Sequence, residues 1–266
     1  MKLPFRFAST LTAAAMCAGT ALAQTAAPAA APAAPSAPAA AAPAKPTINA
    51  KAMERLKAMG AHLRMLKAFS VTADTTSDLV LDSGQKIETT QVVEMSARMP
   101  NMLTVSVQAP LRSRKIYYDG KEVTIYGEKL GYYGTFKAPD TIAATLEAAA
   151  KKHGIEVPLA DLFYFGTEKS NLAAVTEALY TGPQRVGGVL CDNFAFRQPD
   201  VDWQVCIERG KNPLPRKMIV TTTDVAERPQ QRSVLTWKPG VAPAPAAFTF
   251  KAPKDAKKIA VKEMAS

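Results

Sequence analysis

The chain has few of the residues from which most catalytic and metal sites are built. Its 266 residues include 3 Cys and 2 His, which is too few for a cysteine-rich or histidine-rich metal cluster. It also lacks the Gly-x-Ser-x-Gly, P-loop, His-Glu-x-x-His and Cys-x-x-Cys motifs of hydrolases, nucleotide-binding proteins, zinc proteases and thioredoxin-like proteins. We therefore expect a noncatalytic protein that has no metal site and no cofactor.

The mature protein also lacks an apolar run that is long enough to span a membrane. The first 23 residues instead follow the pattern of a secretory signal peptide. Lys2 and Arg6 form its charged start, an apolar stretch follows, and residues 21–23 form an Ala-Leu-Ala cleavage site before Gln24. Met16 precedes Cys17, where a lipid-anchored protein needs a small residue. The sequence therefore predicts a soluble protein that is exported to the periplasm.

Residues 24–46 contain little except alanine and proline, with 13 Ala and 6 Pro in 23 positions. Proline at this frequency prevents a continuous helix, and alanine alone offers too little apolar surface to fold. We expect a disordered linker, which is either a spacer or an unselected low-complexity leader. A single periplasmic domain is predicted to follow over residues 47–266.

The predicted domain begins with a helix. Apolar residues recur at spacings of three and four from Met53 to Phe69, opposite a charged face. A second helix is predicted over residues 141–153, where Gly154 follows in a helix-ending position. Most other segments alternate apolar and polar residues with a period of two, down to a short last strand over residues 248–250. Antiparallel strands with a few segregated helices predict the α+β class, with helices on one face of the sheet.

Tyrosines gather on two neighbouring predicted hairpins. We expect them to pack as strand-forming aromatic residues, and the alternative is that they line a ligand site. The group consists of Tyr117, Tyr118, Tyr126, Tyr132 and Tyr133.

One predicted hairpin carries both cysteines of the mature protein. Cys191 and Cys206 face the same side of its two strands. With a two-residue loop Cys191 lies directly opposite Cys206, whereas with a four-residue loop Cys206 lies opposite Asn193 and diagonal to Cys191. Because the periplasm is oxidising and both registers keep the two cysteines on one face, we expect a Cys191–Cys206 disulfide, for which the diagonal register is the less favourable geometry.

Short segments occur in a fixed order along the domain: YDGK at 118–121, PDTI at 139–142, PLADL at 158–162, GVLCDNFAFR at 188–197, DWQ at 202–204, IE at 207–208 and PLPRK at 213–217. Together they resemble the signature of a large family of predicted periplasmic proteins of unknown function, over roughly residues 50–260. That family usually has His where Asn193 stands and a large apolar residue where Cys206 stands. The resemblance brings no catalytic residues with it, and the disulfide would be a property of this chain rather than of the family.

The family is similar in fold to the outer-membrane lipoprotein carriers of the Lol type and related lipid-binding lipoproteins. The resemblance implies a curved antiparallel sheet, an incomplete β-barrel, which a few helices close over an apolar cavity. The expected ligand of such a carrier or sensor is a lipid or lipoprotein acyl chain or another apolar molecule. By strand parity and the position of the closing segment, we expect the cavity to be lined by Leu103, Val105, Val107, Ile125, Phe163, Phe194, Phe196, Trp203 and Val205.

The alternative function is an envelope protein-interaction module that has a filled core and uses its surface and a basic tail. The formal net charge of +10 becomes +8 when Lys2 and Arg6 are removed. The tail holds five lysines against Asp255 and Glu263, so we expect an envelope protein or an anionic membrane surface as partner, and no nucleic acid. A tail that only aids solubility is the simpler interpretation. The lysines are Lys251, Lys254, Lys257, Lys258 and Lys262.

Overall fold

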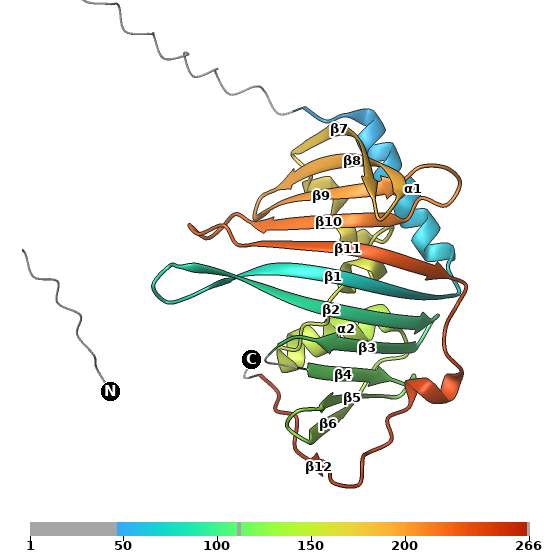
Figure 1. The fold of residues 1–266 in the computed structure, drawn as a ribbon. Coiled ribbons are helices and arrows are strands. Elements are labelled where there is room, and N and C mark those ends of the chain that lie inside the picture. Colours follow the sequence, from blue (N-terminus) through green and yellow to red (C-terminus); the bar gives the residue numbers. More distant parts are fainter. Residues whose placement is uncertain (1–46, 111–112, 265–266) are drawn as a thin grey trace, which may run out of the picture. The chain divides into compact units, whose positions relative to one another are not determined.

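The computed structural model describes residues 47–110 and 113–264, which belong to a compact unit spanning Lys45–Ser266. The predicted signal peptide and the Ala/Pro linker lie outside the described residues. The strands form one sheet of twelve strands in the order β12-β6-β5-β4-β3-β2-β1-β11-β10-β9-β8-β7 (Figure 1). They are β1 (Ala68–Val80), β2 (Lys86–Arg98), β3 (Met102–Gln108), β4 (Ser113–Tyr118), β5 (Glu122–Gly127), β6 (Tyr132–Lys137), β7 (Glu177–Val186), β8 (Val189–Gln198), β9 (Val201–Glu208), β10 (Pro215–Thr222), β11 (Gln230–Pro239) and β12 (Lys257–Lys258).

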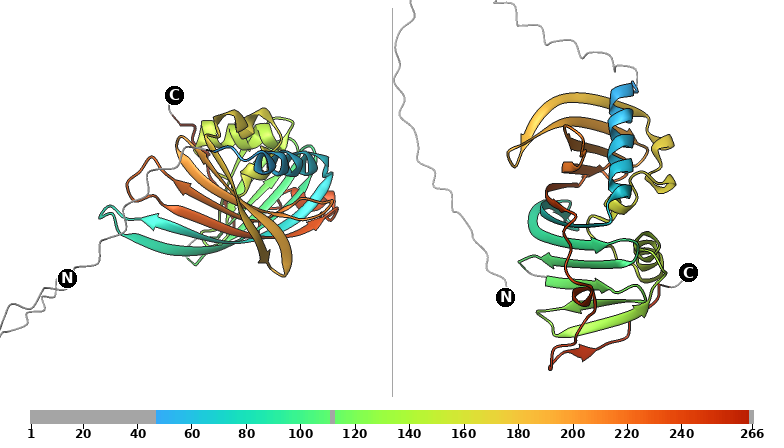
Figure 2. Two further views of the ribbon diagram at one scale, coloured as in Figure 1. Left: turned by 90° about the horizontal axis from the view of Figure 1, so that it is seen from above. Right: turned by 90° about the vertical axis from the view of Figure 1, so that its right-hand side faces the viewer.

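The sheet curves without closing into a barrel. Its strand order ends with β12 at one edge and β7 at the other, and all neighbouring strands are antiparallel except the short pair of β12 and β6. Helices α1 (Ala50–Met65) and α2 (Ile142–His153) lie across the concave face (Figure 2). This arrangement confirms the predicted α+β class and the incomplete barrel. In the described part of the chain, no helix is long and apolar enough to cross a membrane.

Helix α1 is shorter than its apolar pattern predicts. It begins after Asn49, whose side chain accepts a hydrogen bond from the Ala52 backbone N–H at 3.0 Å. It ends at Met65 rather than at Phe69, because Phe69 belongs to β1 and points at the concave face. There the Phe69 ring lies 5.3 Å from the ring of Trp237 on β11. A three-residue spacing suits either the next helical turn or the first inward position of a strand, and pairing on both sides of β1 selects the strand.

Helix α2 has the predicted bounds to within one residue. The Thr141 side chain caps its start, and Gly154 ends it in the left-handed conformation at φ 63°. The chain then runs through three short 3₁₀ helices, η1 (Ala160–Phe163), η2 (Glu168–Ser170) and η3 (Leu172–Ala174), before it enters β7. We call residues 154–174 the covering loop, because they lie with the two helices over the concave face (Figure 2).

The core lies between the concave face of the sheet and the helices. The register aligns inward side chains in rows across many strands, as the period-two alternation predicts. One such row consists of Trp237, Val71, Met95, Val105, Ile116 and Ile125. From α1, the buried side chains of Leu56, Met59 and Leu63 pack against this face.

The cysteine hairpin has the diagonal register, with Cys206 opposite Asn193. Its loop is shorter than the four residues predicted with that register, because Gln198 also pairs with Val201 and leaves only Pro199 and Asp200 between the strands. The Cα atoms of the two cysteines are 5.5 Å apart, which is within the usual range for a disulfide. Cys191 and Cys206 are fully buried and bonded to each other, which confirms the predicted disulfide.

Strands β7 and β12 were not predicted, and the predicted strand over residues 248–250 is wrong. Strand β7 contains Gly182 and Pro183 and has a bulge after Tyr180, which interrupts the alternation. The predicted strand over residues 248–250 is absent, because the chain there leaves the 3₁₀ helix η4 (Pro245–Phe248) and Phe250 packs against other rings. Those rings belong to Tyr117, Tyr126 and Tyr133, with centroids 5.0–5.5 Å away.

The basic tail follows the edge of the sheet. Lys257 and Lys258 form β12 beside β6, and the Met264 backbone N–H donates to the Lys152 carbonyl at 2.7 Å. Val261 of the tail packs directly on Gly134 of β6, so closely that a Cβ atom on Gly134 would lie 2.5 Å from a methyl carbon of Val261. The tail therefore packs on the domain, while its lysine side chains stay exposed.

Candidate ligand-binding groove

The nine residues predicted to line a cavity lie in a packed core. All are buried except Ile125, which is half-buried. The Phe196 and Trp203 rings stack with centroids 4.3 Å apart, and Phe163 of η1 packs on Phe69 at 5.9 Å. Of the nine, only Trp203 also lines the groove described next. The sheet and helices bring the predicted residues together, and their side chains pack against one another.

An open groove lies beside this core, between the covering loop and the concave face of the sheet. It consists of two adjoining pockets, of about 590 Å³ and about 340 Å³. Both pockets are lined by Asp161, Tyr164 and Val220, so they adjoin at these three residues. Their combined size is in the range of small-molecule sites.

The larger pocket, which we call the polar pocket, begins where the concave face of the long strands changes character. Along β1 the inward residues run from Phe69 and Val71 to Thr75 and Ser77. The hydroxyl groups of Thr75 and Ser233 lie 2.9 Å apart and mark the end of the apolar core. Beyond them, the sheet lines the polar pocket with Ser77, Gln91, Thr222 and Gln231.

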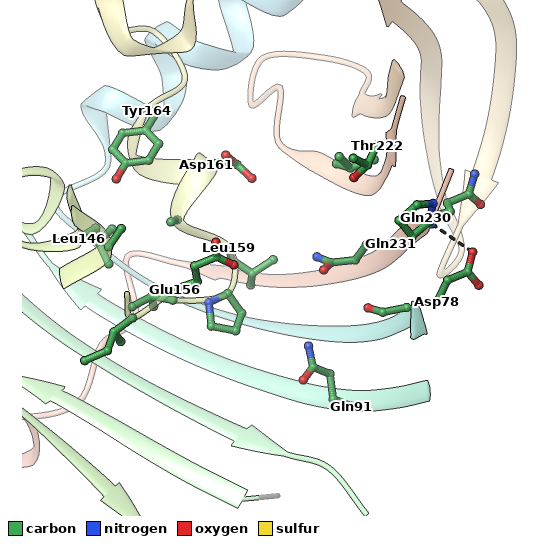
Figure 3. Close-up of a pocket in the computed structure, with 18 of the residues that line it drawn as sticks. Asp78, Gln91, Leu146, Glu156, Leu159, Asp161, Tyr164, Thr222, Gln230 and Gln231 are labelled. Carbon is green, nitrogen blue, oxygen red and sulfur yellow. Dashed lines mark hydrogen bonds between the residues drawn. The ribbon is translucent and has the colours of Figure 1, made fainter. Parts of the chain in front are cut away.

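The opposite wall of the polar pocket is the covering loop. Leu159 holds a left-handed backbone at φ 63° immediately before η1, a conformation that costs a leucine energy. Two hydrogen bonds fix the loop from α1, because Arg64 donates to the carbonyls of Leu162 and Phe163 at 2.6 Å and 2.7 Å. Figure 3 shows Asp161 projecting from this loop toward the space that Gln91 and Gln231 enter from the sheet.

Three titratable groups of the groove have shifted pKa values. The protein around the Asp161 carboxyl keeps water from part of it and raises its pKa, against a smaller opposing effect of its own backbone N–H. Burial also raises the pKa of Tyr164, and the charges of Glu147 and Asp161 add to the effect. Asp78 at the far rim behaves oppositely, because the Gln230 backbone N–H and the Lys86 ammonium lower its pKa.

The smaller pocket is more apolar, and we call it the aromatic pocket. Phe165 of the covering loop lies 6.0 Å from the ring of Trp203 on β9, and both line the pocket with Met218 and Val220 of β10. The Trp203 indole N–H donates to the Gln198 side chain at 3.0 Å, so its polar atom is satisfied. The groove therefore joins an apolar end to a polar end.

The polar lining was missed by the sequence analysis. Ser77 and Gln91 continue the inward parity of β1 and β2 past the last apolar positions, and that continuation is the signal that could have identified them. Asp161 lies within the segment 158–162, and the family resemblance assigns no role to its carboxylate. Among the described residues, no three His, Cys, Asp or Glu side chains lie close enough together to hold a metal ion.

A scan against protein families matches residues 52–262 to the family described as predicted periplasmic protein, DUF2092. The match covers most of the chain, so the protein belongs to this family, as the ordered segments predict. The periplasmic location predicted from the signal peptide agrees with the description of the family. A search of curated proteins found no match.

Several solved structures are similar to this chain at low sequence identity. Lipoprotein LppX of Mycobacterium tuberculosis is 9% identical, with a TM-score of 0.46, over 73% of this chain and 98% of that one. LprF from Mycobacterium bovis is 12% identical, with a TM-score of 0.47, over 76% of this chain and 99% of that one. MucB in the MucA/MucB complex of Pseudomonas aeruginosa is 15% identical, with a TM-score of 0.36, over 76% of this chain and 62% of that one.

Proposed function

We propose that this protein is a noncatalytic periplasmic carrier or sensor, which binds a lipid acyl chain or another apolar ligand in the groove. The observation that carries the proposal is the junction of the aromatic and polar pockets at Asp161, Tyr164 and Val220. An amphipathic ligand has the same two-part character, with a chain that avoids water and a head that needs hydrogen bonds.

The proposed site differs from the interior cavity that the sequence suggests. Leu103, Val105 and Phe194 are buried in contact with the rest of the core, and a close-packed core admits a chain only if side chains move. The aromatic pocket offers about 340 Å³ next to this core without such movement. The chain of the ligand would lie along Trp203, Met218 and Val220.

The test is displacement of a fluorescent fatty acid from the mature protein, residues 24–266, combined with two matched variants. Val220→Asp places a charge in the wall that both pockets share, and we expect at least tenfold weaker probe binding. Val92→Asp makes the same change on the opposite face of the sheet, where Val92 is also half-buried, and should leave binding unchanged. Equal binding by both variants would contradict the groove as the site.

Mass spectrometry of lipids that copurify with the protein gives a second, independent readout. The proposal expects a bound acyl lipid that is lost from Val220→Asp and retained by Val92→Asp. A protein that carries no lipid and binds no fatty acid probe would overturn the carrier function.

The second candidate is the envelope interaction module, which is favoured by the filled core and the exposed edge of the sheet. Leu130 and Ile259 are 76% and 51% exposed at that edge, beside the lysines of the tail. Exposed apolar groups that are rimmed by charge are typical of interaction surfaces. This candidate predicts partner binding that Val220→Asp does not affect.

A further inference from the structure

We propose that the polar pocket binds an uncharged, hydroxyl-bearing head group, such as a glycerol or a sugar, which is attached to the chain held in the aromatic pocket. The inference rests on the proposed function and adds the class of the head group. It follows from the hydrogen-bonding groups that line the polar pocket and from the balance of charge among them.

The first observation is a set of side chains whose polar atoms lack protein partners. Within the described residues, no other residue hydrogen-bonds to the side chains of Ser77, Gln91, Thr222, Gln231 or Tyr164, and all of them line the polar pocket. Gln230 differs, because its side-chain amide donates to the Thr221 hydroxyl at 3.0 Å. Hydroxyl and primary amide groups each offer donors and acceptors, and this mixture matches a ligand whose hydroxyl groups both donate and accept.

The second observation is the placement of these groups. The part of the concave face that lines the pocket is polar, whereas the same strands are apolar nearer the helices, as from Val71 to Ser77 along β1. Figure 3 shows Gln91 and Gln231 entering the pocket from different strands, with Asp161 facing them from the covering loop. Groups from β2, β11 and η1 therefore surround one space rather than a flat surface.

The third observation is charge, which argues against an anionic head. The lining includes the carboxylates of Asp78, Glu156 and Asp161 and one guanidinium, that of Arg114. Arg114 donates to the Glu156 carbonyl at 2.9 Å, and Lys86 at the rim pairs with Asp78 at 3.2 Å. A phosphate or carboxylate normally requires arginine or lysine donors, and here it would face an excess of negative charge.

The Asp161 carboxylate suits a hydroxyl-bearing ligand. It hydrogen-bonds to no other residue among those described, and it stands where the polar and aromatic pockets meet. A ligand hydroxyl that donates to it would replace the hydration that the groove partly removes. Asp161 therefore marks the position expected for the first hydroxyl group beyond the chain.

The experiment compares four amphiphiles of equal chain length as competitors for a fluorescent fatty acid on the mature protein. They are a monoacylglycerol, a fatty acid, a lysophosphatidic acid and an alkyltrimethylammonium ion, each used below its micelle concentration. We expect the monoacylglycerol to displace the probe at about one-tenth the concentration of either anion. This ratio corresponds to one or two hydrogen bonds that the monoacylglycerol makes with the unpartnered side chains of the polar pocket and the anions do not.

Variants separate the head-group inference from the proposed function. Gln91→Leu and Gln231→Leu should each weaken monoacylglycerol binding by about threefold to tenfold, on the usual value of a neutral hydrogen bond, and leave the fatty acid unchanged. Gln204→Leu, which lies on the opposite face of β9, is the matched control.

Each outcome has one meaning. If the fatty acid or the lysophosphatidic acid binds as tightly as the monoacylglycerol, the neutral head group is wrong and chain binding stands. If the alkyltrimethylammonium ion binds most tightly, the carboxylates select a cation, and the neutral head group is again wrong. If no amphiphile displaces or binds, the proposed function fails together with the inference.

Discussion

Two glycines determine how closely the covering loop approaches helix α1. A Cβ atom on Gly60 would lie 2.5 Å from the backbone nitrogen of Gly166, and one on Gly166 would lie 2.6 Å from the Gly60 carbonyl carbon. Both contacts are with backbone, which cannot rotate away as a side chain can. The loop that forms one wall of the groove is therefore held at main-chain contact distance from α1.

We expect Gly60→Ala to lower the free energy of unfolding by about 1–3 kcal/mol, which is the usual effect of overpacking. A loss of stability would be informative, because helix propensity alone predicts that alanine stabilises a helix by about 1 kcal/mol relative to glycine. Urea unfolding is the measurement, and Ala61→Gly at the neighbouring exposed position is the control, with a loss of about 1 kcal/mol expected from helix propensity alone. A stabilised Gly60→Ala variant would show that the loop does not contact α1 in this way.

The disulfide allows a second prediction at this scale. Cys191 and Cys206 are separated by 15 positions, and closing a loop of that length stabilises by about 3 kcal/mol on the chain-entropy estimate. The double variant Cys191→Ala/Cys206→Ala should therefore unfold at lower urea than the oxidised wild type. Wild type and double variant should unfold alike in a reducing buffer. Two free thiols per denatured, nonreduced wild-type chain would contradict the bond.

Single residues show what the sequence can predict and what it cannot. The facing of Val105 or Phe194 follows from alternation and agrees with the register. The register of the hairpin that holds Cys191 and Cys206 does not follow from alternation, because Pro199 and its neighbours permit more than one turn. Whether inward side chains fill a space or leave it open depends on volumes and curvature, and periodicity contains neither.

At the scale of elements, one buried charge joins β7, β8 and the residue after β9. Asp192 of β8 accepts hydrogen bonds from Tyr180 and, at 2.6 Å and 3.0 Å, from Arg209. Burial by itself would raise the pKa of Asp192, but these hydrogen bonds and the charges of Arg209 and Lys51 together lower it. The edge of the sheet near β7 is therefore stabilised by the ionised carboxylate.

The sign of the pH dependence follows from that lowered pKa. A carboxylate whose pKa is lower in the folded state contributes stability above its unfolded value of about 3.9, and this stability is lost as pH falls through the folded value. We expect Asp192→Asn to lose about 1–2 kcal/mol at pH 7, since Arg209 is partly exposed. The gap between the two proteins, measured by urea unfolding, should narrow below about pH 4. A gap that is constant from pH 7 to pH 3 would exclude the charge as the cause.

The elements that were missed share a physical reason. Strand β7 contains a glycine, a proline and a bulge, so its alternation is broken, and β12 has two residues. Both lie at the edges of the sheet, where pairing depends on tertiary contacts rather than on local pattern. The groove was missed for a related reason, since its polar lining comes from strands that are far apart in the sequence.

The C-terminal segment is the element best placed to meet a charged surface. Its backbone is tied to β6 and α2, so the exposed lysines are presented in fixed positions beside Leu130 and Ile259. We expect cosedimentation with anionic vesicles at low salt, and Lys254→Gln/Lys257→Gln/Lys258→Gln should weaken it about 100-fold at about 1 kcal/mol per lysine. Lys151→Gln on α2 serves as a single-charge control. Absence of wild-type binding at low salt would leave only the role in solubility.

At the scale of the whole molecule, an incomplete barrel explains why a groove and a filled core coexist. The helices and Phe163 fill the concave face where the strands are apolar, and the strands of the central sheet continue past that cover. The sheet therefore extends past the helices and the covering loop. The concave face next to them is polar, and the exposed side chains of Leu79 and Ile87 lie beyond it at the end of the hairpin. The groove lies at this boundary, which is set by the lengths of β1 and β2 relative to α1 and the covering loop.

The last prediction concerns where this molecule works. The pattern of residues 1–23 predicts cleavage after Ala23, and the disulfide requires an oxidising compartment to form and persist. We expect the mature protein to begin at Gln24, to be released by osmotic shock and to carry no acyl group. N-terminal sequencing and intact mass of the released protein check all three points.

Ala23→Asp, which disrupts the cleavage site, should retain the uncleaved chain at the membrane, while Ala15→Ser in the apolar stretch should be processed normally. A diacylglyceryl group on Cys17 would instead identify a lipid-anchored protein, and the groove would then lie close to the membrane that supplies its ligand.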